Sequence, residues 1–174
     1  NETFKKTKIV SAFPGCGKTE CWKKYKDPKY NFKILDSDSS TFDKEHFPEN
    51  YIKHIRENLG KVDVIFISSH KTVRDALKKD KKINELITSK KVKFIVAYPN
   101  INDKDEYIER YKMRGSTDSF IKLISDNWES WITDMENEKA THYKIGKKYL
   151  SDYIKPWKNE KKVYDRNVID GPVF

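Results

Sequence analysis

The chain has 174 residues, which is enough for one domain with a substantial apolar core. Its 36 lysines and arginines outnumber 27 aspartates and glutamates, so the formal net charge is +9 and the surface suits anionic ligands. The sequence has neither a signal-peptide pattern nor a long apolar span, which argues against secretion and membrane insertion. We expect a cytoplasmic monomer or homodimer with no membrane partner.

Apolar periodicity predicts strands that alternate with helices. The predicted strands span residues 7–11, 32–35, 62–67, 92–98 and 141–145. Helices are predicted from the loop after the first strand to about 27, and then at 49–58, 103–114, 117–136 and 149–154; helical sequence is also predicted through 73–77 and then 83–87. This alternation predicts an α/β domain of three layers, in which helices flank a mostly parallel five-stranded sheet. We treat residues 1–174 as one domain, with a small helical lid at about 103–120 and a weakly patterned tail at 156–174.

The most informative motif lies between the first strand and the first helix, at Ala12-Phe13-Pro14-Gly15-Cys16-Gly17-Lys18-Thr19. It matches the phosphate-binding pattern G-x-x-x-x-G-K-[ST], with alanine at the first glycine position. The two glycines let backbone N–H groups turn toward phosphate oxygens, and the helix start adds unpaired N–H groups. Lys18 is expected to reach the β- and γ-phosphates of ATP, and the Thr19 hydroxyl to ligate Mg²⁺. The motif predicts a P-loop NTPase fold whose nucleotide-binding loop consists of Pro14, Gly15, Cys16, Gly17, Lys18 and Thr19.

Two carboxylates follow the second predicted strand. Asp36 and Asp38 are two positions apart, so both are expected to face the crevice at the carboxyl ends of the strands. One carboxylate could take the proton of an attacking hydroxyl group, and the other could hold a Mg²⁺-bound water. We assign both as candidate catalytic residues, Asp36 also to the metal site and Asp38 also to the acceptor. A polar turn or a helix cap is the alternative interpretation.

Two arginines share one face of the helix predicted after the fourth strand. Arg110 and Arg114 are four residues apart, and Gly115 follows them as a possible hinge. Phosphoryl transfer requires positive charge around the transferring group, and mobile arginines can supply it. We predict that both arginines are catalytic lid residues. Ordinary surface ion pairing, for example of Arg110 with Glu106, is the alternative.

A third polar cluster follows the third predicted strand. His70, Lys71 and Arg74 could bind an anionic acceptor, with Arg74 holding a phosphate through two parallel hydrogen bonds. These residue types occur near many anions, so the cluster by itself is a weak indicator of function.

Taken together, these residues resemble the small P-loop kinases of the nucleoside monophosphate kinase type, and compact phage nucleotide kinases most of all. The resemblance covers about residues 8–154 and concerns the order of elements. It implies transfer of the γ-phosphoryl group of ATP, with Mg²⁺, to a nucleoside or deoxynucleoside monophosphate. It also implies an acceptor region at 36–40 and 70–74 and a lid that carries Arg110 and Arg114.

One departure from that family affects the metal. The third strand ends in Ile67-Ser68-Ser69, whereas many nucleoside monophosphate kinases have Asp-Gly there. Asp63 lies at the other end of the strand. Asp36 or Asp38 is therefore the better candidate for the outer shell of Mg²⁺.

Two neighbouring families share parts of the pattern. Asp36-Ser37-Asp38 is similar to the Asp-x-Asp of shikimate kinases, and residues 106–115 are similar to the lid of phage polynucleotide 5′-kinases. Those polynucleotide kinases also have a Pro-Gly-x-Gly-Lys-[ST] loop and a catalytic aspartate about as far beyond the lysine as Asp38 lies beyond Lys18. The second hypothesis is therefore a polynucleotide 5′-hydroxyl kinase or another hydroxyl kinase, with nucleic acid as the partner. A non-catalytic ATP-binding module is the third.

Overall fold

The computed structural model describes residues 3–156, which form an α/β fold around one five-stranded sheet. All strand pairs are parallel, in the order β2-β3-β1-β4-β5. The strands are β1 (Thr7–Ala12), β2 (Ile34–Asp36), β3 (Val64–Ile67), β4 (Val92–Tyr98) and β5 (Thr141–Lys144). The predicted five-stranded sheet is confirmed, and each strand begins and ends within two residues of its predicted bounds.

Six α-helices are described, together with several short 3₁₀ turns. The helices are α1 (Lys18–Tyr25), α2 (Glu49–Asn58), α3 (Lys71–Lys79), α4 (Lys81–Thr88), α5 (Lys104–Met113) and α6 (Asp118–Glu136). The helix predicted at 149–154 is instead a 3₁₀ turn at Leu150–Asp152, since the backbone bonds from the Asp152 N–H to the Tyr149 carbonyl and from the Tyr153 N–H to the Leu150 carbonyl join residues three apart. In the described part of the chain, no helix has an apolar stretch long enough to cross a bilayer.

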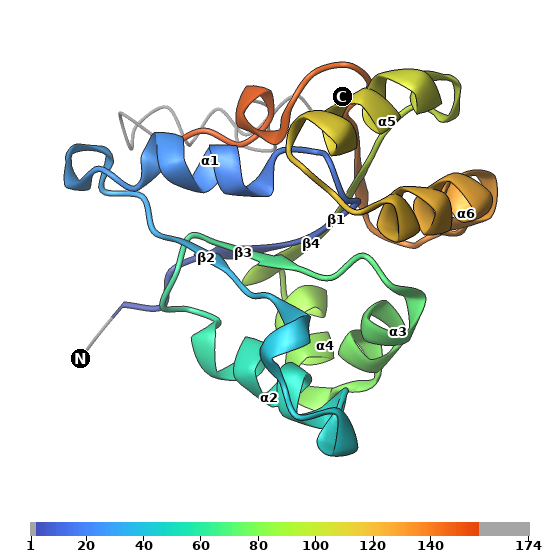
Figure 1. Ribbon diagram of the computed structural model, residues 1–174. Coiled ribbons are helices and arrows are strands. Elements are labelled where there is room, and N and C mark those ends of the chain that lie inside the picture. Colours follow the sequence, from blue (N-terminus) through green and yellow to red (C-terminus); the bar gives the residue numbers. More distant parts are fainter. Residues whose placement is uncertain (1–2, 157–174) are drawn as a thin grey trace.

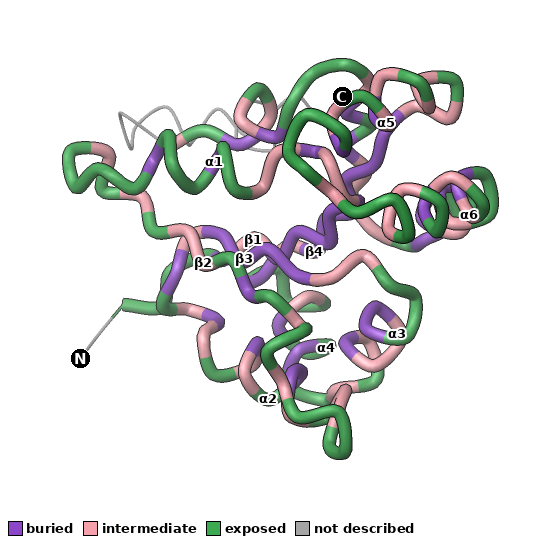
Figure 2. The backbone as a smooth tube through the Cα atoms, in the orientation of Figure 1, coloured by how far each residue is buried: buried purple, intermediate pink, exposed green. Residues whose placement is uncertain are grey.

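The helices make two outer layers around the sheet. Figure 1 shows α1 and α5 on one face of the sheet, and α2, α3 and α4 on the other. Helix α6 packs against α5 and β4. The central strands are buried along most of their length (Figure 2), as a parallel sheet covered on both faces requires. This arrangement confirms the predicted three-layer architecture.

The strand register brings the carboxyl ends of β1, β2 and β3 to one edge of the sheet. Ser11 is paired with Ile67, so the residues after β1 and β3 emerge side by side. The Ser11 hydroxyl donates to the Ser68 carbonyl at 2.9 Å. The buried Tyr51 hydroxyl donates to the Ser37 carbonyl at 2.7 Å and accepts from the Ser68 N–H at 3.2 Å. These contacts hold the ends of three strands together at the edge where parallel α/β sheets bind ligands.

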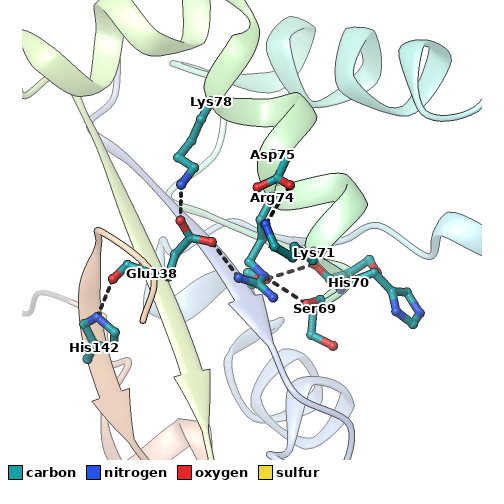
Figure 3. Close-up of polar contacts among 10 residues, drawn as sticks. Ser69, His70, Lys71, Arg74, Asp75, Lys78, Glu138 and His142 are labelled. Carbon is teal, nitrogen blue, oxygen red and sulfur yellow. Dashed lines mark hydrogen bonds and ion pairs between the residues drawn. The ribbon is translucent and has the colours of Figure 1, made fainter. Parts of the chain in front are cut away.

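A buried ion pair joins α3 to the segment before β5 (Figure 3). The Arg74 guanidinium donates to the Glu138 carboxylate at 2.5 Å and to the Ser69 carbonyl at 3.0 Å. Lys78 donates to the second oxygen of the same carboxylate. His142 on β5 contacts the Glu138 carbonyl at 2.8 Å. The side chains of Arg74 and Glu138 are 3% and 5% exposed, so water does little to stabilise either charge.

Glu138 should make stability depend on pH. Burial raises the pKa of its carboxyl, but hydrogen bonds from Lys78 and Arg74 outweigh burial, so the pKa lies below its usual value. Glu138→Gln should lower the free energy of unfolding by about 3 kcal/mol at neutral pH, because the Arg74 charge stays buried without its partner. The stabilisation is complete above the unfolded pKa of about 4.3 and is lost as pH falls through the lower folded value. Urea unfolding of both proteins across pH measures this difference.

The matched control is Glu136→Gln, which removes a half-exposed partner of Lys144. This change should cost less than about 1 kcal/mol at any pH. Equal losses in the two variants would contradict the role given to the buried pair.

Candidate functional site

The loop between β1 and α1 has the backbone shape that the sequence motif predicts. Gly15 and Gly17 have φ angles of 90° and 97°, which side-chain-bearing residues rarely adopt. A Cβ atom on Gly15 would lie 2.8 Å from the Tyr111 ring, and one on Gly17 would lie 3.0 Å from the Tyr149 ring. Both positions therefore require glycine for conformation and for space.

Three successive carbonyl groups of this loop have donors from outside the loop. Tyr111 Oη donates to the Pro14 carbonyl at 2.7 Å, Arg110 Nη1 to the Gly15 carbonyl at 2.8 Å, and the Leu150 N–H to the Cys16 carbonyl at 2.8 Å. In a planar peptide the N–H points opposite to the C=O. Donors that fix the carbonyl groups outward therefore turn the N–H groups of Gly15 and Gly17 toward the inside of the loop, while the Cys16 N–H donates to the Phe13 carbonyl at 3.3 Å.

Arg110 is a central part of this support. Its guanidinium lies between the rings of Tyr107 and Tyr149, with centroid distances of 4.3 and 3.9 Å. Besides the Gly15 carbonyl, it donates to the carbonyl groups of Lys147 and Lys148 at 2.6 and 3.0 Å. The side chain is 8% exposed. Arg110 was predicted to stabilise transferring phosphate, but the structure places it as a clamp on the loop. It also contacts Glu106 at 3.2 Å, so the alternative ion pair is present as well.

Arg114 lies in a different environment on the same helix. It is exposed, and its Nε donates to the Ser116 hydroxyl at 3.1 Å. With Met113 and Tyr149 it lines a cavity of about 540 Å³ beside the loop. The remaining lining residues are Gly15, Gly17, Lys18, Thr19, Glu20, Lys23 and Arg110. The cavity adjoins the glycine loop and has the Tyr149 ring on its wall. Its volume lies in the range usual for small-molecule binding sites.

Cys16 contributes its backbone and not its thiol. The side chain is fully buried, and burial raises the pKa of the thiol to about 12. Cys21 on α1 is also buried, with its pKa likewise raised to about 12 by burial. Both cysteines are free, and these thiols are protonated at physiological pH and have no nucleophilic role.

The Lys18 ammonium interacts electrostatically with two carboxylates at the end of β2, Asp36 and Asp38. Burial and the negative charge of Asp38 raise the pKa of the Asp36 carboxyl, and the positive charge of Lys18 lowers it. Burial is the largest of these effects, so the pKa lies above its usual value. Hydrogen bonds from the Ser40 N–H and hydroxyl lower the pKa of Asp38, so this carboxylate is charged and caps a 3₁₀ turn. Asp38 thus has the capping role that the sequence left open, while its side chain remains exposed beside Lys18.

The predicted acceptor residues after β3 separate into two environments. His70 precedes α3 and lies 5.7 Å from the Trp131 ring. Burial lowers its pKa, and the positive charges of Arg74 and Lys18 lower it further. Lys71 is exposed and pairs with Asp75 at 2.9 Å. Arg74 faces the interior, as Figure 3 shows, and its charge is neutralised by Glu138. The Arg74 guanidinium is therefore held by Glu138 and the Ser69 carbonyl, although the side chain also borders a small pocket of about 50 Å³ with His70 and Lys71.

The oxygen donors beside the loop fit Mg²⁺ held together with phosphates. Magnesium prefers oxygen ligands and keeps several waters, so it needs few protein groups. Thr19 offers a hydroxyl at the start of α1, and Asp36 a carboxylate that is electrostatically coupled to Lys18. Residues 3–156 contain no group of three or more His, Cys, Asp or Glu side chains that could form an all-protein metal site. A magnesium ion would depend on the nucleotide for the rest of its ligands.

The sequence analysis missed Tyr149 and the supporting tyrosines of α5. Tyr107 and Tyr111 are fully buried beneath the loop, and Tyr149 is 40% exposed at the rim of the cavity. Tyr107 and Tyr111 lie within the helix predicted at 103–114, but nothing in the sequence indicated their contact with the loop. Tyr149 lies outside any recognisable motif, so only the fold brings it to the loop.

The structure was compared with solved structures. The fold is similar to that of YorR from Bacillus subtilis, which was crystallised in complex with phosphorylated GDP. The two chains are 15% identical, the match covers 94% of each chain, and the TM-score is 0.52. The structure of APE1195 matches over 100% of this chain and 99% of its own, with 15% identity and a TM-score of 0.43. Family models and curated proteins gave no match to this sequence. The likeness to YorR shows a shared fold.

The two arginines of α5 should respond differently to the same substitution. Arg110→Lys should lower the free energy of unfolding by about 1–3 kcal/mol, because lysine cannot satisfy three carbonyl groups from between two rings. Arg114→Lys should change it by less than about 0.5 kcal/mol, since Arg114 is exposed. Urea unfolding of both variants tests this. A larger loss for Arg114→Lys would contradict the clamp role of Arg110.

Proposed function

We propose that the protein is an ATP-dependent phosphotransferase that moves the γ-phosphoryl group to a nucleoside or deoxynucleoside monophosphate in the cytoplasm. One observation carries the proposal: a glycine loop with outward-fixed carbonyl groups leads into Lys18, whose charge acts on Asp36, Asp38 and His70. A donor phosphate on the loop would therefore meet polar groups from the ends of β2 and β3. That arrangement suits transfer between two bound molecules.

The loop and Lys18 would hold the donor. Free N–H groups of the loop and the first turn of α1 favour phosphate, and Lys18 adds a positive charge. Thr19 and Asp36 would hold Mg²⁺, which shields the negative charge of the phosphates when bound. The cavity lined by Met113, Arg114 and Tyr149 would take the nucleoside of ATP, with the Tyr149 ring available for stacking on the base.

The acceptor would approach from the ends of β2 and β3. Asp38 is charged and exposed, so it can orient an acceptor group or take its proton. His70 and Lys71 are the proposed contacts for an acceptor phosphate, and Arg74 holds α3 in place beneath them. Arg114 can reach the transferring group when the lid closes, because nothing buries its guanidinium. Transfer would be in-line, with the protein supplying position and charge.

The runner-up is a polynucleotide 5′-hydroxyl kinase. It is favoured by the exposure of Asp38, which leaves this carboxylate open to an acceptor larger than a mononucleotide. A hydroxyl acceptor, unlike a phosphate, would also require a base, and the exposed Asp38 carboxylate could take that role, although its lowered pKa makes it a weak base.

An acceptor panel with purified protein tests the proposal. With ATP and Mg²⁺, the protein should phosphorylate at least one ribo- or deoxynucleoside monophosphate. Lys18→Ala should reduce kcat by about a hundredfold to a thousandfold, since it removes one charge-stabilising donor. Lys81→Ala, an exposed lysine at the start of α4, is the matched control and should keep full activity. Product is measured by separating the nucleotides.

Three other outcomes would change the assignment or the role of Lys18. Transfer to a 5′-hydroxyl oligonucleotide, with no monophosphate accepted, would favour the runner-up. ATP binding without transfer to any acceptor would indicate a binding module, and unchanged turnover in Lys18→Ala would refute the role of the loop lysine.

A further inference from the structure

Charge is distributed unevenly between two helices. Residues 18–33, which include α1 and the turn after it, contain six lysines and two acidic residues. Helix α6 has the opposite balance, with five acidic residues and one lysine. A general excess of lysine would not concentrate positive charge in one segment. The helix dipole accounts for Lys23 and Lys24 in the last turn of α1, but it does not account for the lysines beyond that turn.

These lysines line two adjoining hollows. The first, about 530 Å³, is bordered by Lys23, Lys24, Lys26 and Lys29. The second, about 880 Å³, is bordered by Lys5, Lys26, Lys33 and Lys61. The hollows share Lys26, Asp27 and Pro28, and the first meets the nucleotide cavity at Lys23. We call the two hollows together the lysine groove. It begins beside the nucleotide cavity and continues past the far end of α1.

Protein carboxylates neutralise little of this charge. Within the described residues, Lys24, Lys26, Lys29, Lys33 and Lys61 form no ion pair, and Lys5 is 3.7 Å from Asp63. The nearby acids are engaged with the backbone: Asp27 accepts from the Lys29 N–H, and Asp63 accepts from the Lys33 N–H. Several like charges at one surface repel each other, and an external polyanion would relieve that repulsion.

Aromatic rings are interleaved with the ammonium groups. Lys26 Nζ lies 4.9 Å from the Trp22 ring centroid, and Lys29 Nζ lies 5.1 Å from that of Tyr30. Trp22 is 37% exposed, and its ring lies next to Lys26, which borders both hollows. An acidic peptide would bind through the positive charge alone and would make no use of the rings. Flat rings beside a basic track suit unstacked bases on a phosphodiester backbone.

We propose that the lysine groove binds single-stranded nucleic acid through its phosphate backbone, with bases packed on Trp22 and Tyr30. This site is separate from the proposed transfer reaction, because the groove lies along α1 and away from Asp38 and His70. The proposal for the groove is therefore the same for either acceptor of the transfer reaction.

The test measures binding of a fluorescent twelve-nucleotide single strand by anisotropy, without ATP or Mg²⁺, over a range of salt concentrations. The triple variant Lys26→Gln, Lys29→Gln, Lys33→Gln should bind about tenfold more weakly near 50 mM salt. The slope of log K against log salt should fall in magnitude by about two, because each phosphate contact to a single strand contributes about 0.7. Circular dichroism of the same sample shows whether the variant is folded.

The control carries the same charge change elsewhere. Lys53→Gln, Lys81→Gln, Lys82→Gln replaces three exposed lysines on α2 and α4, on the other face of the sheet, and should keep the wild-type affinity and slope. Equal losses in the two triple variants, or wild-type binding that ignores salt, would overturn the proposal. So would binding to vesicles of anionic lipid without binding to the oligonucleotide, since the groove would then be a membrane-surface site. Loss of kinase activity alone would concern the transfer reaction and leave the groove unaffected.

Discussion

The backbone of the loop at residues 14–17 is the constraint on which the site depends. A loop that turns its N–H groups toward phosphate must turn its carbonyl groups away, and buried carbonyl groups need donors. Here the donors come from Tyr111, Arg110 and the Leu150 N–H. The phosphate loop is therefore completed by α5 and by the segment after β5, more than ninety residues away in the chain. Its glycines are required because those supporting rings leave no space for a Cβ atom.

The electrostatics of the site follow from which charges the fold neutralises. Arg74 and Arg110 are both buried, and each is held by protein oxygens. Lys18 and Arg114 lie at the open side of the loop. Burial thus divides the cations of the crevice into those that maintain the structure and those that remain available for an anionic ligand. The residue types alone do not make this distinction, because arginine serves both purposes.

The sequence predicted the fold well because β3 and β4 are short, mostly apolar runs between polar turns. The segments at 64–67 and 92–98 are buried on both faces, as their continuous apolar sequence indicates. The conformation of the loop at 12–19 was predictable because it depends on residues next to each other in the sequence: Gly15 and Gly17 adopt positive φ angles, and α1 begins at Lys18. The roles of Arg74 and Arg110 were not predictable in this way. Their partners lie 64 and 95 residues away, at Glu138 and Gly15, and helix spacing carries no information about such contacts.

Arg110 and Arg114 illustrate why spacing identifies a face but not a function. Both were expected on one side of the lid helix, and both line the same cavity. Arg110 is one turn closer to the loop, where Tyr107 and Tyr149 enclose its guanidinium and three carbonyl groups accept from it. Moving it from that position would cost these hydrogen bonds. Arg114 is exposed; it donates to the Ser116 hydroxyl, and its guanidinium lies 5.1 and 5.6 Å from the ring centroids of Tyr111 and Phe120. One turn of helix therefore separates a residue that fixes the loop from one that is free to act on what the loop holds.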